Sequence, residues 1–185
     1  MVKKAKEDGV KVTAEVCPHH FAMTEDEIAG DDANYKMNPP LRSAADVEAL
    51  VDGLADGTME AISTDHAPHG EEEKKQSIAK APFGIVGSET AYALSVTHLV
   101  KTGKLTPLQL VEKMSTNPCR ILSVPGGTLS VGAPADITIA DMDSEYVIDK
   151  NTFLSKGKNT PFDGAKVNGR VYYTIVGGNI VYQYE

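Results

Sequence analysis

The sequence contains no tryptophan, few cysteines and no apolar run near the roughly 18 residues that a membrane-spanning helix needs. Its two cysteines, Cys17 and Cys119, lie far apart and outside any CxxC spacing. The pattern therefore favours neither a disulfide framework nor a structural zinc knuckle. Residues 1–8 carry no apolar signal core. These absences predict a cytoplasmic protein that is not inserted in a membrane.

Positive charge is also scarce, because 18 Lys and Arg face 26 Asp and Glu and give a net charge of -8 at pH 7. A protein that binds a phosphate backbone normally has a clustered excess of Lys and Arg, so nucleic acid is excluded as a partner. A small-molecule ligand is favoured instead. With 41% hydrophobic and 24% charged residues, the 185-residue chain has the composition of a folded globular protein.

The hydrophobic pattern predicts an α/β protein in which polar residues follow a buried strand. The expected elements are a helix ending at Gly9, a strand over Val10–Val16, a helix over Ala44–Leu54 capped by Ser43 and stopped by Gly57, a strand over Met59–Thr64, and helices over 89–101, 107–114 and 118–122. Asp65 and His66 come directly after the strand that starts at Met59. Functional side chains of α/β proteins commonly occupy such strand ends.

From Gly126 onward, glycine-rich turns separate short β-branched runs at Ile137–Ala140, Arg170–Val176 and Asn179–Tyr184. The residue pattern of the chain thus changes near residue 125. The sequence predicts an α/β domain over residues 1–125 and a small β-rich lobe over residues 126–185.

The densest group of chemically capable side chains is Asp65-His66-Ala67-Pro68-His69. A carboxylate at a strand end is placed to ligate a metal or to accept a proton, and an imidazole four residues later reaches the same pocket. The alternative is that Asp65 caps a turn while both histidines are solvated. The motif alone leaves both interpretations open.

Two further segments have a chemical and a purely structural interpretation. In Cys17-Pro18-His19-His20, adjacent histidines suggest a metal site, but neighbouring side chains of an extended chain point to opposite sides. A structural role is therefore favoured for them. In Asn38-Pro39-Pro40, a rigid turn could present the Asn38 amide to a substrate, although Asn before Pro is also a common turn former.

Taken together, the motifs resemble those of the dihydroorotases of the class I type, within the amidohydrolase superfamily. In chain order they are Ala14-Glu15-Val16-Cys17-Pro18-His19-His20-Phe21, Met37-Asn38-Pro39-Pro40-Leu41-Arg42, Thr64-Asp65-His66-Ala67-Pro68-His69, Ala81-Pro82-Phe83-Gly84-Ile85-Val86-Gly87, the run from Gly126 to Asp136, and Asn159-Thr160-Pro161-Phe162. The resemblance covers essentially the whole chain.

This resemblance implies the C-terminal part of a metal-dependent (β/α)8 TIM barrel plus a small β-rich lobe, with the active site at the carboxyl ends of the strands. Asp65 matches the family's metal-ligating aspartate, which is also its general acid/base. Asn38 and His69 match positions that hold the dihydroorotate ring and its carboxylate. Phe83 and Gly84 match a backbone segment that contacts the pyrimidine ring.

The implied activity is the zinc-dependent, reversible hydrolysis of (S)-dihydroorotate to N-carbamoyl-L-aspartate in pyrimidine biosynthesis. In the family, the other metal ligands precede the segment that matches this chain: a His-x-His pair, a carboxylated lysine or an aspartate, and two later histidines. Because a lone carboxylate binds zinc weakly, we expect Asp65 alone not to retain it. The expectation is an incomplete enzyme, silent by itself, with a partner fragment or a homo-oligomer.

Other cyclic amidohydrolases, the allantoinases and dihydropyrimidinases, share parts of these motifs. His69 is the discriminating residue, since the Asp-His-Ala-Pro-His form resembles the dihydroorotase version. A third interpretation is a non-catalytic dihydroorotase-like subunit that binds aspartate transcarbamoylase. Retention of Asp65, His69 and Asn38 together argues against that interpretation.

Overall fold

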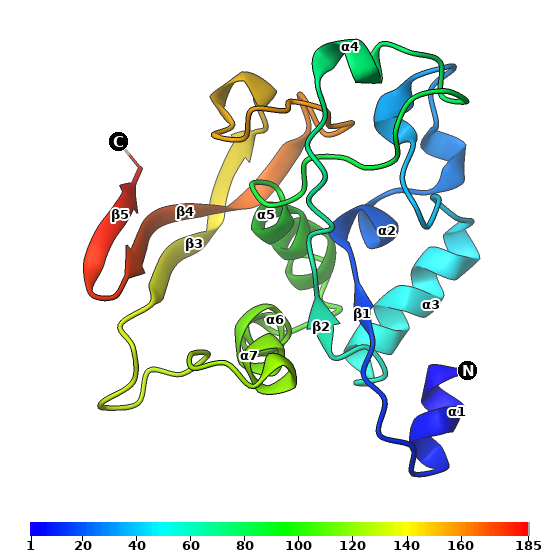
Figure 1. The fold of residues 1–185 in the computed structure, drawn as a ribbon. Coiled ribbons are helices and arrows are strands. Elements are labelled where there is room, and N and C mark those ends of the chain that lie inside the picture. The colour runs from blue at the N-terminus through cyan, green and yellow to red at the C-terminus, as the bar shows by residue number, and fades with distance from the viewer. Residues whose placement is uncertain (185) are drawn as a thin grey trace.

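In the computed structural model, which describes residues 1–184, helices and short strands alternate first and a three-stranded sheet follows (Figure 1). The elements are α1 (Val2–Glu7), β1 (Glu15–Val16), α2 (Pro18–Ala22), α3 (Ala44–Ala55), β2 (Ala61–Ile62), α4 (Glu71–Lys74), α5 (Ala91–Ser95), α6 (Pro107–Val111), α7 (Asn117–Leu122), β3 (Ile137–Val147), β4 (Lys166–Val176) and β5 (Asn179–Gln183). Two π-helical segments, η3 (Val96–Val100) and η4 (Glu112–Thr116), extend α5 and α6.

Strands β1 and β2 pair in parallel, with Glu15 opposite Ala61 and Val16 opposite Ile62. A parallel bridge between His66 and Ile85 brings a third segment alongside. Because parallel strands end at the same edge, the residues that follow β1, those that follow β2 and those around Ile85 lie near one another. This edge positions the candidate site.

Helix α3 forms where the sequence predicts it, with the predicted Ser43 cap at its start. The Ser43 hydroxyl accepts a hydrogen bond from the Asp46 backbone N–H at 3.3 Å, which satisfies one of the free donors at the helix start. Its apolar face buries Val51 and Leu54 against a core formed by β1, β2 and the helical region.

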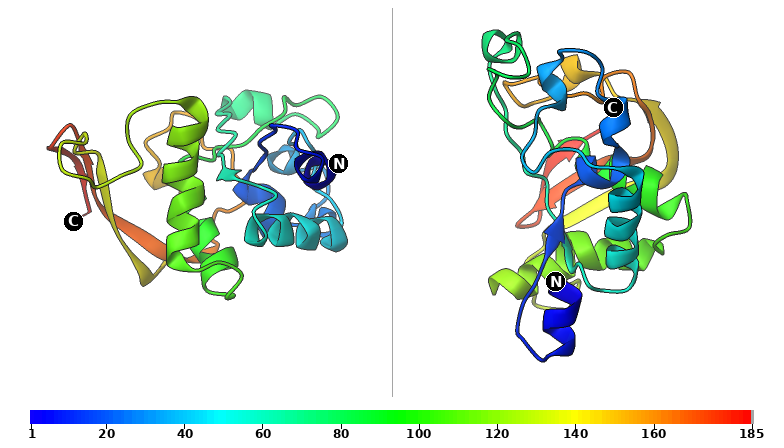
Figure 2. Two further views of the ribbon diagram at one scale, coloured as in Figure 1. Left: turned by 90° about the horizontal axis from the view of Figure 1, so that it is seen from below. Right: turned by 90° about the vertical axis from the view of Figure 1, so that its right-hand side faces the viewer.

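The carboxyl-terminal strands form an antiparallel sheet in the order β3, β4, β5. Figure 2 shows this sheet on one side of the helices and α1 on the other. A second core joins Leu94 of α5 to Ile148, Phe162 and Val167 of the β-rich part. The lobe therefore packs directly on the helices, and its boundary near residue 125 stays a prediction.

Strand lengths differ from those expected. The strand predicted over Val10–Val16 is paired only at Glu15 and Val16, because its partner β2 is itself two residues long. Conversely, β3 continues beyond Ala140 to Val147, since β4 pairs along it. Alternation of apolar residues marks extended chain, but the partner strand decides how much of it becomes sheet.

Within residues 1–184, no helix has both the length and the apolar character that crossing a membrane requires.

Candidate active site

Asp65 follows β2 at the strand-end edge and is exposed. Its backbone φ of 45° lies in the left-handed region, which residues other than glycine rarely occupy. Such a conformation costs about 1–3 kcal/mol and persists where the surroundings impose it, typically at functional sites. The strained backbone is consistent with a chemical role for Asp65.

His66 is bound to the backbone of the neighbouring segment. Its Nδ1 accepts hydrogen bonds from the backbone N–H groups of Gly87, at 3.1 Å, and Ser88, at 3.2 Å. Two donors aimed at Nδ1 require it to be unprotonated, so the ring proton of the neutral form resides on Nε2. His66 thus holds the loop after Ile85 against the end of β2, although its side chain is exposed.

His69 contacts another of the predicted site residues. A carbonyl oxygen only accepts, so His69 Nε2 donates to the Phe83 carbonyl, at 2.9 Å. The other ring nitrogen, Nδ1, lies 3.9 Å from a carboxylate oxygen of Glu73. The structure therefore places His69 and Phe83 together and sets the orientation of the imidazole.

Asn159 joins these segments. The motif Asn159-Thr160-Pro161-Phe162 did not predict this role. The Asn159 Oδ1 accepts from the His69 backbone N–H at 2.9 Å, and its Nδ2 donates to the carbonyls of Ala67 and Gly84 at 3.0 and 3.1 Å. The residue is only 6% exposed. One buried amide thus satisfies three backbone groups on either side of the candidate site.

We expect Asn159→Ala to lower the free energy of unfolding by about 3 kcal/mol, because each buried backbone group left without a partner costs about 1–3 kcal/mol. Denaturant unfolding of both proteins measures the difference. Asn151→Ala is the matched control, since Asn151 is exposed and bonds locally to Asp149. The control should change stability by less than about 0.5 kcal/mol. Equal effects of the two substitutions would refute the role of Asn159.

The Asn38 segment lies at the same edge. The carbonyl of Pro39 accepts from His20 Nε2 at 2.8 Å, and the carbonyl of Lys36 accepts from the Gly84 backbone N–H at 2.9 Å. Asn38 itself is exposed. The segment is thus tied both to α2 and to the Phe83–Gly84 loop, while the substrate-binding role of Asn38 stays a prediction.

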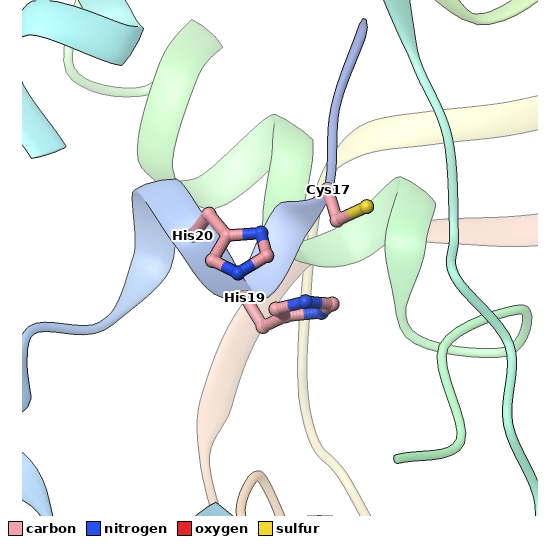
Figure 3. Close-up of side chains that lie close together, drawn as sticks. All are labelled: Cys17, His19 and His20. Carbon is pink, nitrogen blue, oxygen red and sulfur yellow. The ribbon is translucent and has the colours of Figure 1, made fainter. Parts of the chain in front are cut away.

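His19 and His20 lie in a short helix rather than in extended chain, so the premise that the two histidines point to opposite sides is wrong, while Cys17 just before the helix is extended. Pro18 starts the short helix α2. Figure 3 shows both imidazole rings on one side of α2, beside Cys17, and their centroids are 4.2 Å apart. Pro18 at the first helical position was the available sequence signal, because proline favours that position.

The electrostatics of this group differ from residue to residue. Burial, together with neighbouring His20, lowers the pKa of His19 to about 3, so its imidazole is neutral. Burial raises the pKa of the Cys17 thiol, and the carboxylates of Asp65 and Glu15 add to the effect. A raised pKa disfavours the thiolate, so Cys17 is not an activated nucleophile.

A catalytic metal at Asp65 requires ligands besides this carboxylate, because open zinc sites take about three protein ligands. Among residues 1–184, the His, Cys, Asp and Glu side chains that converge as a group of three are Cys17, His19 and His20, without Asp65. The described residues therefore do not by themselves form the metal site that the resemblance assigns to Asp65.

Comparison with known proteins identifies the family of this chain and several similar proteins. The profile of the amidohydrolase family matches residues 1–181. Dihydroorotases from Bacillus licheniformis and Pelotomaculum thermopropionicum are 56% and 55% identical over 183 residues, which is 99% of this chain and 43% of each relative. The chain thus spans about two fifths of the length of the curated relatives it matches.

Solved structures agree on the fold. The L-hydantoinase (dihydropyrimidinase) from Arthrobacter aurescens superposes with a TM-score of 0.89 at 33% identity, over 98% of this chain and 42% of that one. The dihydropyrimidinase from Brevibacillus agri gives a TM-score of 0.91 at 26% identity, over 98% and 41%. The expected fold, part of an amidohydrolase barrel with a small β-rich lobe, is confirmed. This chain belongs to the amidohydrolase family.

Proposed function

We propose that this chain is part of a dihydroorotase, which reversibly hydrolyses the ring amide of (S)-dihydroorotate to N-carbamoyl-L-aspartate. The observation that carries the proposal is the identity of more than half of the aligned residues with several dihydroorotases, across almost the entire chain. The shared strand-end edge of Asp65, His69 and Phe83 supports it.

In this proposal, Asp65 is a metal ligand and the general acid/base that moves the proton to the leaving nitrogen. His69 and Asn38 hold the carboxylate and ring of the substrate. The Phe83 carbonyl already accepts from His69, and the Gly84 carbonyl from Lys74 and Asn159. The pyrimidine ring would therefore meet the Phe83 N–H or the remaining lone pair of its carbonyl.

Enzymes of the amidohydrolase family are generally metal-dependent. We propose zinc as the metal, with Asp65 as the ligand that this chain supplies and the other ligands from residues beyond those described here. The two free cysteines suit a reducing compartment, and we propose a cytoplasmic location. Fractionation of cells that express the protein tests the location.

A chimera tests the activity directly. Replacing the matching segment of the Bacillus licheniformis dihydroorotase by this chain should give an enzyme with kcat/KM for dihydroorotate within about tenfold of its parent, a difference of about 1.4 kcal/mol in activation free energy. The unmodified parent is the control. A chimera that unfolds cooperatively but does not turn over dihydroorotate would contradict the proposal and favour a non-catalytic subunit that binds aspartate transcarbamoylase.

The second candidate function is that of a dihydropyrimidinase or hydantoinase, which the solved structures favour at 26–33% identity. Dihydroorotate carries a ring carboxylate that dihydrouracil lacks, and in our proposal His69 binds it. Assaying the chimera with dihydroorotate, dihydrouracil, hydantoin and allantoin separates the candidates. Turnover of dihydrouracil, hydantoin or allantoin but not dihydroorotate would overturn our choice.

A further inference from the structure

Three potential metal ligands converge where β1 ends and α2 begins. One ligand atom from each of Cys17, His19 and His20 lies within 4.8 Å of the others. Two atoms bound to one tetrahedral zinc lie roughly 3.3–3.6 Å apart, given Zn–S and Zn–N distances of about 2.3 and 2.0–2.1 Å. Figure 3 shows the three side chains lying close together where β1 leads into α2.

His19 offers a nitrogen that the protein itself leaves without a partner. Its side chain is 2% exposed, and its Nε2 is buried without a hydrogen-bond partner among the described residues. Buried polar atoms nearly always have a hydrogen-bond partner or a bound ion, so we expect a ligand at this nitrogen. A neutral imidazole nitrogen with a free lone pair is a metal ligand.

The surroundings of His20 match those of a metal-bound histidine. Its Nε2 donates to the Pro39 carbonyl at 2.8 Å, which leaves the lone pair on Nδ1. Metal-ligating histidines commonly donate their second ring N–H to a carbonyl in this way, which fixes the ring and its tautomer. The Asn38-Pro39 segment thus holds His20 with one nitrogen ready to bind.

Cys17 has a hydroxyl beside its sulfur, because Ser63 Oγ is 3.4 Å from Cys17 Sγ. A hydroxyl at this distance can donate to a thiolate and stabilise it.

We propose that Cys17, His19 and His20 bind one thiophilic divalent cation of the Zn²⁺ class, at a site distinct from the metal position at Asp65. One thiolate and two imidazoles are borderline-soft donors that select zinc, cobalt or cadmium over magnesium or calcium. Three protein ligands leave the fourth tetrahedral position to a water molecule or a small anion.

Titration of the reduced, metal-free chain with Co²⁺ tests the site, because thiolate ligation produces a charge-transfer absorption in the near ultraviolet. We expect this band to saturate at one Co²⁺ per chain and to disappear when Zn²⁺ is added. Cys17→Ser should abolish the band, whereas Cys119→Ser, the matched control, should keep it. A band of equal strength in the Cys17→Ser protein would overturn the proposal.

The histidines are tested by affinity. His19→Gln and His20→Gln should each weaken Co²⁺ binding at least about tenfold, whereas His98→Gln should not. The chain unfolded in guanidinium should also bind at least about tenfold more weakly than the folded chain. Equal affinity would show that the short sequence binds without the fold, which would refute a built site.

A further measurement needs no variant. Zn²⁺ should slow alkylation of Cys17 by iodoacetamide at least about tenfold while Cys119 continues to react, as measured by peptide mass spectrometry. Unchanged alkylation of Cys17 at saturating Zn²⁺ would overturn the proposal. None of these readouts depends on dihydroorotate hydrolysis, so this proposal and the proposed function fail independently.

Discussion

Asp65→Asn in the chimeric dihydroorotase is expected to lower kcat/KM for dihydroorotate by about 10³-fold, within the range that a general acid/base contributes. An amide neither exchanges the proton nor ligates a metal as a carboxylate does. The fold should be unaffected, because the backbone of residue 65 has a φ of 45° and asparagine tolerates that region well. Steady-state kinetics of the two proteins measure the loss.

The control is Asp52→Asn, which removes an exposed carboxylate from α3 away from the strand-end edge. Its kcat/KM should stay within about twofold of the parent chimera, because surface substitutions change free energies by only about 0.5 kcal/mol. Thermal unfolding of both variants excludes a folding defect. An Asp65→Asn chimera that retains the parent activity would remove Asp65 from the chemistry.

Features that arise from neighbouring residues were predictable from the sequence. The Ser43 cap, the apolar spacing of α3 and the polar residues after β2 are all encoded within a few positions of one another. Helices near 91–100 and 107–122 were predicted for the same reason. Local propensity and hydrophobic periodicity are sufficient where no distant partner is required.

Features that depend on distant segments were not predictable in this way. Asn159 bonds to His69 across 90 positions of the chain, and nothing near either residue indicates the partner. The hydrogen bond from His20 to Pro39 likewise depends on how two loops fold back. Motif order placed Asp65, His69 and Asn38 in one family pattern, but contacts among the segments required the three-dimensional structure.

Gly84→Ala is expected to destabilise the chain by about 4 kcal/mol. A Cβ at position 84 would lie 2.3 Å from the Cβ of Ala67, and the backbone φ of 112° disfavours any L side chain. Backbone strain costs about 1–3 kcal/mol, and overpacking of a tight contact costs about as much again. Denaturant unfolding measures the sum, and a loss below about 1 kcal/mol would show that the loop readily moves away from the end of β2.

Two further substitutions separate the cost of backbone strain at residue 84 from the cost of the contact with Ala67. Gly57→Ala carries backbone strain alone, because Gly57 has a φ of 83° and no atom lies within 4 Å of the added Cβ, so it should cost about 1 kcal/mol. Ala67→Gly removes the clashing methyl group, and the next atom of residue 67 would then be 3.6 Å from the new Cβ. The double variant Ala67→Gly with Gly84→Ala should therefore recover about 2 kcal/mol relative to Gly84→Ala. Additive losses instead would mean that the two segments do not touch in solution, and the strand-end edge that aligns His69 with Phe83 would not exist in the arrangement described.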